Sequence, residues 1–464
     1  MSRLSQRTSI LILLLAVHGC KHYQQQPLDP AAELASLGQR SVRDFDVGHS
    51  KPGEGPVVER VSFDPTDGLD ESEVIAVALT LNPDLRAKRT ETGEAQALLI
   101  QAGIWPNPEV GVGWRRGIGG AGHTVDADLL WELLKPWERT ARKDIAEARM
   151  DEIRAEIAAE EWKLVAETRL QRLNVLSGEQ SLALLEQEVS LRERALEIVK
   201  RRRDAGDGTE LDVSAAALET AEVRRDHRRA ETELAAVRRE LNRLLGLPPQ
   251  YDLRLADSGK PLGMTVYDDL PDAELEQRLL AGRFDLRAME SAYGRAEHQL
   301  RLAVYRQYPG LKIGPSFGRE SEGDNFLGLG VAIEIPFTDR NQGDIAEKES
   351  VREKARAAYV GLLHRLKASA YEARARLRRT RLEVEAQEKE VLPLIMQNQE
   401  LFERAFQARE LSILDWVTAQ QRTLKARQSY LETLTRYQGS VIELEAATGM
   451  PLSSDVEETP KKGD

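Results

Sequence analysis

Cysteine and aromatic side chains are scarce in this chain of 464 residues. The single cysteine, Cys20, excludes an intrachain disulfide framework and a cysteine-based zinc cluster. Only 5% of the residues are aromatic, whereas 31% are charged. This balance is typical of long solvated helices rather than of a compact enzyme.

An excess of positive charge is also missing. The formal net charge of −12 argues against a nucleic-acid partner, because phosphate contacts need clustered lysine and arginine. The sequence holds no phosphate-binding loop, nucleophile elbow or metal-binding box, and its seven histidines lack metal-ligand spacing. We therefore predict no catalytic residue, no metal site and no cofactor, and we do not expect an enzyme.

Long apolar runs are absent as well. The run ILILLLAV at 10–17 follows two arginines and is shorter than the ~20 apolar residues of a membrane-spanning helix. It predicts a signal peptide at residues 1–19. The ending VHGC resembles a lipoprotein signal, in which Cys20 becomes the lipidated first residue; the alternative is an ordinary signal peptide with a chance cysteine. Any membrane crossing would then be made by strands.

The rest of the sequence consists of two similar halves. The motif DLRA occurs at 84–87 and again at 285–288, and at the same offset Pro108 matches Pro309 and Gly113 matches Gly314. Shared proline and glycine positions are not explained by helix composition, so they indicate an internal duplication. The predicted domains are a lipidated, extended or loosely packed arm at 20–70, a first helix-strand-strand-helix repeat at 71–271, a second repeat at 272–450, and a polar tail at 451–464.

Each half predicts long helices. The helical patterns cover 71–104, 138–204 and a return helix ending near 245 in the first half, and 272–304, 344–408 and a last helix ending near 448 in the second. A helix over 138–204 would be on the order of 100 Å long, which suits a coiled coil or a tube. Pro393 should bend the long helix of the second half.

Between the helices, each half holds two segments with apolar residues at every second position. They lie at 108–115 and 124–133, and at 309–317 and 325–337. Four strands per chain cannot close a barrel, so several chains would pool them, with Trp114, Trp131 and Trp137 as an aromatic girdle. The alternative is a small sheet packed on the helices.

The stretches NPDLRA…AGIWPNPEVGVG and FDLRA…YPGLKIG, with the turn RRRDAGDGTELDV, resemble the TolC-like outer membrane factors of tripartite efflux and secretion systems. The likeness runs from about residue 70 to 450. It implies a mainly α fold with a small β part. Duplicated helical hairpins would form a trimeric α-barrel, and four strands per chain would contribute to a shared transmembrane β-barrel.

The resemblance also implies function and partners. It implies an outer-membrane channel of a tripartite efflux system, a passive exit duct anchored in outer membrane lipid at Cys20 and extending into the periplasm. The partners would be two further copies, a periplasmic adaptor (membrane fusion protein) and an inner-membrane pump of the RND type. A periplasmic adaptor or scaffold lipoprotein without a barrel is the alternative. The cargo, metal ions or organic solutes, is not named by the sequence.

The resemblance also implies roles for individual residues. The helical hairpin ends that would contact the adaptor carry Gly206, Gly208, Leu211, Arg409 and Leu411. Asp415 is the gate candidate, because three copies would form a carboxylate ring that attracts cations; its alternative role is helix-start chemistry, which we expect for Asp212. The acidic residues expected to line the barrel lumen are Asp126, Asp128, Glu132 and Glu334.

Overall fold

The computed structural model describes residues 21–44, 67–116, 122–133, 135–267, 269–320, 323–408 and 413–452. The chain divides into two compact units, Met1–Arg40 and Ser41–Asp464. In the first unit, helix α2 (Pro30–Gly38) follows Asp29, whose carboxylate accepts hydrogen bonds from the amides of Ala31 and Ala32. Residues 21–39 are exposed, and within the predicted arm α2 is a local helix, because a capping aspartate before a proline starts a helix without help from periodicity.

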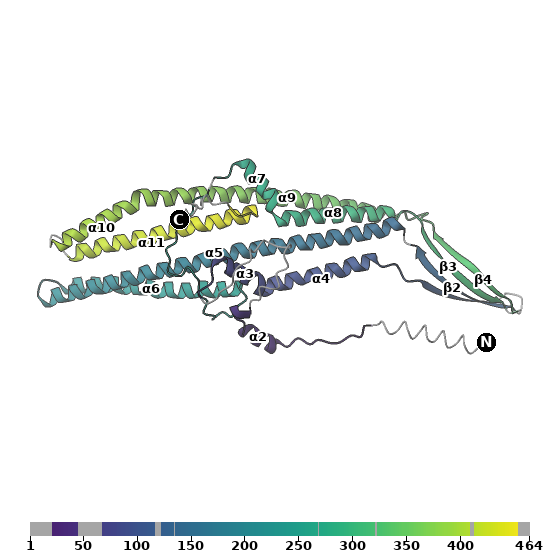
Figure 1. Cartoon of the computed structure of the whole chain (residues 1–464), viewed down its shortest axis with the longest axis horizontal. Coiled ribbons are helices and arrows are strands. Elements are labelled where there is room, and N and C mark those ends of the chain that lie inside the picture. Colours follow the sequence, from purple (N-terminus) through teal and green to yellow (C-terminus); the bar gives the residue numbers. More distant parts are fainter. Residues whose placement is uncertain are drawn as a thin grey trace, which may run out of the picture. The chain divides into compact units, whose positions relative to one another are not determined.

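The second unit repeats one series of elements (Figure 1). After the 3₁₀ turn η1 (Val42–Asp44), the first series is α3 (Glu71–Leu81), α4 (Pro83–Gly103), β1 (Glu109–Arg116), β2 (His123–Leu133), α5 (Pro136–Asp204) and α6 (Glu210–Leu244). The second series is α7 (Asp272–Gly282), α8 (Phe284–Tyr305), β3 (Gly310–Glu320), β4 (Asn325–Glu334), α9 (Gln342–Ala386), the π-helix η3 (Gln387–Val391), α10 (Leu392–Gln407) and α11 (Ile413–Thr448).

The continuous helix expected over 71–104 is broken at Asn82. Asn82 caps α4 by accepting a hydrogen bond from the amide of Leu85 at 3.0 Å, and Pro83 occupies the first helical position. The side-chain amide of Asn82 also donates to the carbonyl of Leu244 at 2.9 Å. The break therefore packs against the end of α6.

The helix expected over 272–304 is broken in the corresponding place, at Arg283. The Arg283 guanidinium donates to the carbonyl of Ala446 at 2.6 Å. Gly449, at φ +74°, lies so close that an added Cβ would be 2.4 Å from the carbonyl oxygen of Gly282. The α7–α8 break thus packs against the end of α11, as the α3–α4 break does against the end of α6.

The long helix expected over 344–408 consists of three segments. Helix α9 ends at Ala386, the π-helix covers Gln387–Val391, and α10 begins at Leu392. Proline cannot supply the amide that a regular helix needs, and its ring clashes with a preceding carbonyl. The interruption lies next to Pro393, where the sequence predicts a bend, and Figure 1 shows the change in direction between α9 and α10.

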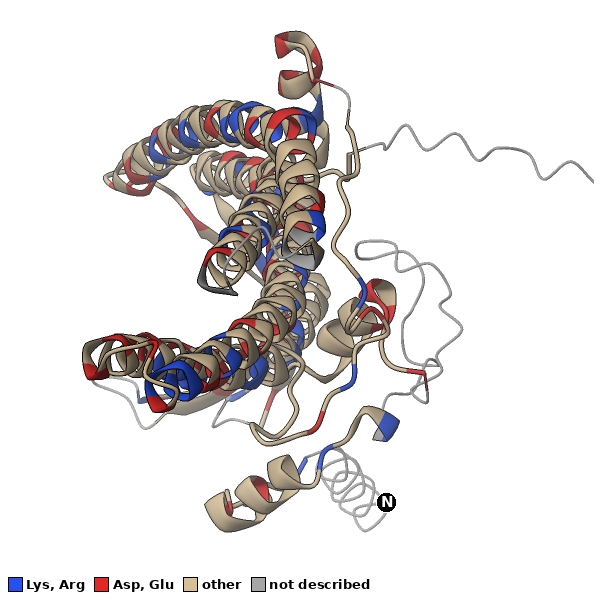
Figure 2. Ribbon diagram, turned by 90° about the vertical axis from the view of Figure 1, so that its left-hand side faces the viewer, with Lys and Arg blue, Asp and Glu red and all other residues tan. Residues whose placement is uncertain are grey.

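Helices α5 and α11 hold the second unit together. Helix α5 packs against α4, α6, α8 and α11, and α11 also packs against α9. Two hydrophobic clusters form near the helix breaks, with Val77 and Leu245 in the first and Leu434 and Tyr437 in the second. Helices α6 and α10 pack mainly against α5 and α11, respectively, so they lie at the edges. Figure 2 shows acidic and basic residues distributed along the helices.

The four strands form one antiparallel sheet in the order β1-β2-β3-β4. Figure 1 shows the strands at the end of the helices opposite to the α5–α6 turn and to α10. Strands β1 and β4 are the edges of this sheet. Among the helices of the described ranges, none has the length and apolar character that crossing a membrane requires.

Candidate functional site: the four-stranded sheet and the hairpin ends

The strand register places the four acidic residues expected in a lumen on one face of the sheet. Asp126 pairs with Gly113, and Asp128 pairs with Gly111. Glu132 lies opposite Lys312, and Glu334 lies opposite Gly310. Residues directly opposite each other on paired strands project to the same side. The shared face is a property of this chain, whereas a lumen-lining role stays a prediction.

Two glycines of β1 make room for the aspartates of β2. A Cβ added to Gly111 would lie 2.6 Å from Oδ1 of Asp128, and one added to Gly113 would lie 2.5 Å from Oδ2 of Asp126. The carboxylates therefore lie flat against the neighbouring strand. Asp126 also forms an ion pair of 2.9 Å with Arg115.

A second ion pair on this polar face was not predicted. Lys312 on β3 contacts both carboxylate oxygens of Glu109 on β1 at 2.9 Å, although β2 lies between the two strands. The two residues are 203 positions apart, so only the sheet register brings them together. Acidic side chains still outnumber basic ones on this face, which gives it negative charge.

The opposite face of the sheet is apolar on all four strands. Val110 and Val112 on β1 are 72% and 74% exposed, and Leu327 on β4 is 80% exposed. Trp114 and Trp131 belong to the same face; the Trp131 indole donates to the carbonyl of Pro106 at 2.9 Å. Contiguous exposed apolar surface of this kind marks contact with lipid or with another chain.

The α5–α6 turn is built by local hydrogen bonds. Gly206 takes φ +84°, a conformation that favours glycine. Thr209 and Asp212 form a capping box at the start of α6, in which each side chain accepts from the other's backbone amide. Hydrogen bonds from Thr209 hold the pKa of Asp212 below its usual value. This is the helix-start role expected for Asp212.

The other residues named for this turn have different surroundings. A Cβ on Gly208 would lie 3.1 Å from the backbone nitrogen of Arg203, so the turn leaves little space there. Leu211 is 78% exposed, and Leu218 two turns later on α6 is 63% exposed. These leucines form an apolar surface near the turn, and their role in partner contact stays a prediction.

The corresponding turn in the second half falls partly outside the described residues. Arg409 and Leu411 belong to the segment 409–412, which lies outside them, as does Cys20. Asp415 lies in the first turn of α11 and is exposed. Its position fits helix-start chemistry, and the gate role stays a prediction that a single chain does not test.

A groove lies between α10 and α11, just beyond the π-helix. Its volume is about 780 Å³, and Leu392, Ile395, Met396 and Tyr430 are among its lining residues. The Tyr430 hydroxyl donates to Glu388 at 2.6 Å. Burial, reinforced by this hydrogen bond and the Glu388 charge, raises the pKa of Tyr430 to about 12.

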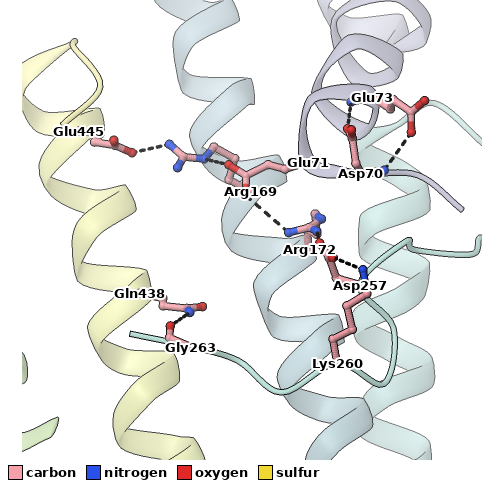
Figure 3. Close-up of polar contacts among 10 residues, drawn as sticks. All are labelled: Asp70, Glu71, Glu73, Arg169, Arg172, Asp257, Lys260, Gly263, Gln438 and Glu445. Atoms are coloured by element: carbon pink, nitrogen blue, oxygen red, sulfur yellow. Dashed lines mark hydrogen bonds and ion pairs between the residues drawn. The ribbon is translucent and has the colours of Figure 1, made fainter. Parts of the chain in front are cut away.

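Ion pairs join the two halves near their middle (Figure 3). Arg169 on α5 contacts Glu71 of α3 at 2.6 Å and also pairs with Glu445 of α11. Arg172, one turn later, pairs with Glu71 and with Asp257 of the connector. Burial alone would lower the pKa of Arg169, but the carboxylates of Glu71 and Glu445 outweigh it, so this pKa is raised. No local pattern could have paired residues so far apart in sequence.

Within the part of the chain that the structure describes, no group of three or more His, Cys, Asp or Glu residues is arranged to hold a metal ion. The acidic residues of the sheet are spaced along strands, and those of the helices are interleaved with arginines.

Residues 74–247 match the family model "Outer membrane efflux protein".

Individual relatives agree with this match. The chain is 25% identical over 397 residues to the cobalt-zinc-cadmium resistance protein CzcC of Cupriavidus metallidurans, covering 84% of this chain and 92% of the relative. The crystal structure of CusC superposes with a TM-score of 0.66 at 20% identity, covering 83% and 94% of the two chains. The Campylobacter jejuni CmeC outer membrane channel gives a TM-score of 0.67 at 14% identity and 93% coverage of both chains. These two likenesses concern the fold.

Proposed function

We propose that the chain is an outer membrane efflux protein, a passive channel and not an enzyme, and that it is the exit duct of a tripartite efflux system. It would couple through a periplasmic adaptor to an inner-membrane pump of the RND type. The pump would supply the energy, and this chain would lower the barrier across the outer membrane.

The observation that carries the proposal is the amphipathic sheet with two unpaired edges. Its apolar face is exposed on β1 and β4 alike, as with Val110 and Leu327, and its opposite face is acidic. An open edge in lipid leaves backbone groups without partners. Three copies that pair β1 of one with β4 of the next would close a twelve-stranded barrel, with the acidic face inside and the apolar face toward lipid.

The two helices at the edges, α6 and α10, both carry exposed apolar side chains. Leu218 on α6 is 63% exposed, and Leu394 and Met396 on α10 are 60% and 68% exposed. Because these two helices lie at opposite edges, a ring of three copies would pack α6 of one against α10 of the next. Such a head-to-tail contact closes when the rotation between copies is 120°. It would extend the duct as a helical tunnel below the barrel.

The hairpin ends farthest from the sheet are the proposed adaptor contacts. The exposed Leu211 and the glycine turn at Gly206 and Gly208 support this on the first hairpin, and Arg409 and Leu411 would contribute from the second. Asp415 would place three carboxylates around the tunnel axis as a gate. A lipid at Cys20 would add an anchor in the outer membrane.

We propose divalent metal cations as the cargo. The name of the Cupriavidus metallidurans relative refers to cobalt, zinc and cadmium resistance. The acidic face with Asp126, Asp128, Glu132 and Glu334 would favour cations over anions. A channel that passes anions as readily as cations would contradict this part of the proposal.

The test combines oligomeric mass with single-channel conductance of the detergent-extracted full chain in a planar bilayer. We expect a trimer with a small cation-preferring conductance that rises in Asp415→Ala. Asp212→Ala is the matched control, because it removes a helix-start aspartate from the other hairpin, and its conductance should remain unchanged.

The other outcomes are equally informative. A trimer whose conductance is the same in Asp415→Ala and wild type would keep the duct and remove the gate. A monomer without conductance would overturn the duct and favour the alternative, an adaptor or scaffold lipoprotein whose sheet packs on helices.

A further inference from the structure

Near the β1–β2 and β3–β4 loops, both faces of the sheet carry arginine side chains. Arg115 and Arg116 are consecutive, and both are exposed. Arg115 lies opposite Thr124 on the polar face and forms an ion pair of 2.9 Å with Asp126. Arg116 lies opposite His123 on the apolar face.

A third basic residue belongs to the apolar face at this level. Arg319 on β3 lies opposite Val125 of β2 and Asn325 of β4, in one row with Trp114 of β1. His123 is two positions from Val125 along β2, so it is a diagonal neighbour of Arg319, within the reach of long side chains. Three basic residues from three adjacent strands thus gather at one corner of the apolar face.

The two arginines of this corner have no neutralising partner within the part of the chain that the structure describes. Arg319 is exposed, and neither it nor Arg116 forms an ion pair with a carboxylate of the described residues. The strand partners of Arg319 on this face, Val125 and Asn325, are neutral. By contrast, the aspartates of the same strands lie on the polar face, where Arg115 is paired.

On the premise of the proposed function, the position of these basic residues in the sheet indicates which part of the membrane they would contact. The apolar face would then lie against lipid, and the loops away from the helices would lie at the outer leaflet. Tryptophan marks the boundary between hydrocarbon and headgroups, and Trp114 lies two residues before Arg116 on the same face. The basic corner would lie just beyond this boundary, at the level of the headgroups.

We propose that Arg116, Arg319 and His123 form a binding site for the phosphate groups of a phosphorylated glycolipid in the outer leaflet. Guanidinium groups bind phosphate through paired, charge-assisted hydrogen bonds. Strands β1 and β3 are about 10 Å apart across β2, and the rows of the two arginines are about 7 Å apart along the strands, so the two backbone positions are about 12 Å apart. The two arginines therefore suit a headgroup that carries two phosphates. A trimer would hold three such sites around its barrel.

The experiment measures lipid retention by the detergent-purified full chain, using native mass spectrometry after incubation with diphosphorylated lipid A. We expect up to three lipids per trimer, and at least about tenfold weaker retention in the double variant Arg116→Gln/Arg319→Gln, because two charge-assisted contacts are lost. Arg115→Gln is the matched control: it removes the same charge one residue away, on the opposite face, and should retain lipid A as the wild type does.

Further variants and competing lipids in the same retention experiment identify the ligand. Arg116→Lys/Arg319→Lys keeps both charges and should restore most of the retention. Lipid A lacking phosphate should bind as weakly as it does to the double glutamine variant. Phosphatidylglycerol that competes as well as lipid A would overturn the glycolipid assignment, and equal retention by the wild type and the double glutamine variant would overturn the site itself.

Conductance of the same preparations separates this proposal from the proposed function. Loss of lipid A binding in a variant that still forms conducting trimers places the effect at the lipid site. A wild-type trimer that conducts but retains no lipid A overturns the site alone. A wild-type protein that neither assembles nor conducts overturns the duct, and with it the premise of the site.

Discussion

The carboxylate of Asp128 lies against the backbone of Gly111 on the neighbouring strand, so closely that a Cβ at Gly111 would be 2.6 Å from Oδ1. The pair shows why the polar face combines acidic residues with glycines. A larger residue at position 111 and a carboxylate at position 128 compete for the same space.

Gly111→Ala should therefore lower the free energy of unfolding by about 1 kcal/mol, because the aspartate must turn aside in a packed strand pair. Thermal unfolding of the detergent-purified protein measures this. Gly93→Ala on α4 is the control: nothing lies within 4 Å of its added Cβ, and alanine favours a helix by up to about 1 kcal/mol. Equal unfolding temperatures of the two variants would contradict the competition between a Cβ at position 111 and the Asp128 carboxylate. The double variant Gly111→Ala/Asp128→Gly should recover the lost stability.

The ion pair between Arg169 and Glu445 should matter for stability because the Glu445 side chain is buried. Arg169→Ala would leave Glu445, which is 4% exposed, without its charged partner, and breaking a buried pair costs about 3–5 kcal/mol. Denaturant unfolding should show this loss, and Arg169→Ala/Glu445→Gln should recover part of it. The exposed pair Arg229–Glu233 is the comparison: Arg229→Ala should be indistinguishable from wild type. A similarly small effect at Arg169 would disprove an energetic link between the halves.

The capping box at Thr209 and Asp212 should make the α5–α6 turn sensitive to acid. The pKa of Asp212 is lowered in the folded chain by hydrogen bonds from Thr209. The stabilisation is therefore fully present above the unfolded value of 3.8 and is lost as the pH falls through the folded pKa. Hydrogen-exchange protection factors of the turn, corrected for intrinsic rates, should fall in this range. Asp212→Asn should abolish the dependence; an unchanged acid response in this variant would assign it to another group.

The edge position of α10 predicts an effect of charge on assembly. Met396 is 68% exposed in the single chain, and the proposed ring would cover it with α6 of another copy. Met396→Glu should shift the detergent-purified protein from trimer toward monomer, because an unpaired charge would be buried in the contact. Light scattering measures the mass. Gln397→Glu adds the same charge at a neighbouring exposed polar residue and should leave the trimer intact. A fully trimeric Met396→Glu would show that α10 faces solvent.

Several features could be predicted because their signals are local. Apolar residues at every second position indicated four strands, and the register confirms that their polar and apolar positions lie on separate faces. The shared prolines and glycines indicated two similar halves, and the elements do occur in two similar series. The helix breaks at Asn82 and Arg283 were missed because the apolar pattern continues across them. The hydrogen bonds from Asn82 to Leu244 and from Arg283 to Ala446 involve residues far along the chain, as does the contact between Gly449 and Gly282.

The sequence by itself determined the helical and strand periodicities, the acidic and apolar faces, and the family resemblance, since each depends on side chains close together in the chain. Only the tertiary structure decided which strands pair in which register, that Lys312 meets Glu109, and that Arg169 joins Glu71 to Glu445. It also placed Arg116 and Arg319 at one corner of the apolar face. These relationships arise between residues separated by tens to hundreds of positions, and they exist only once backbone pairing and helix packing fix the distances between them.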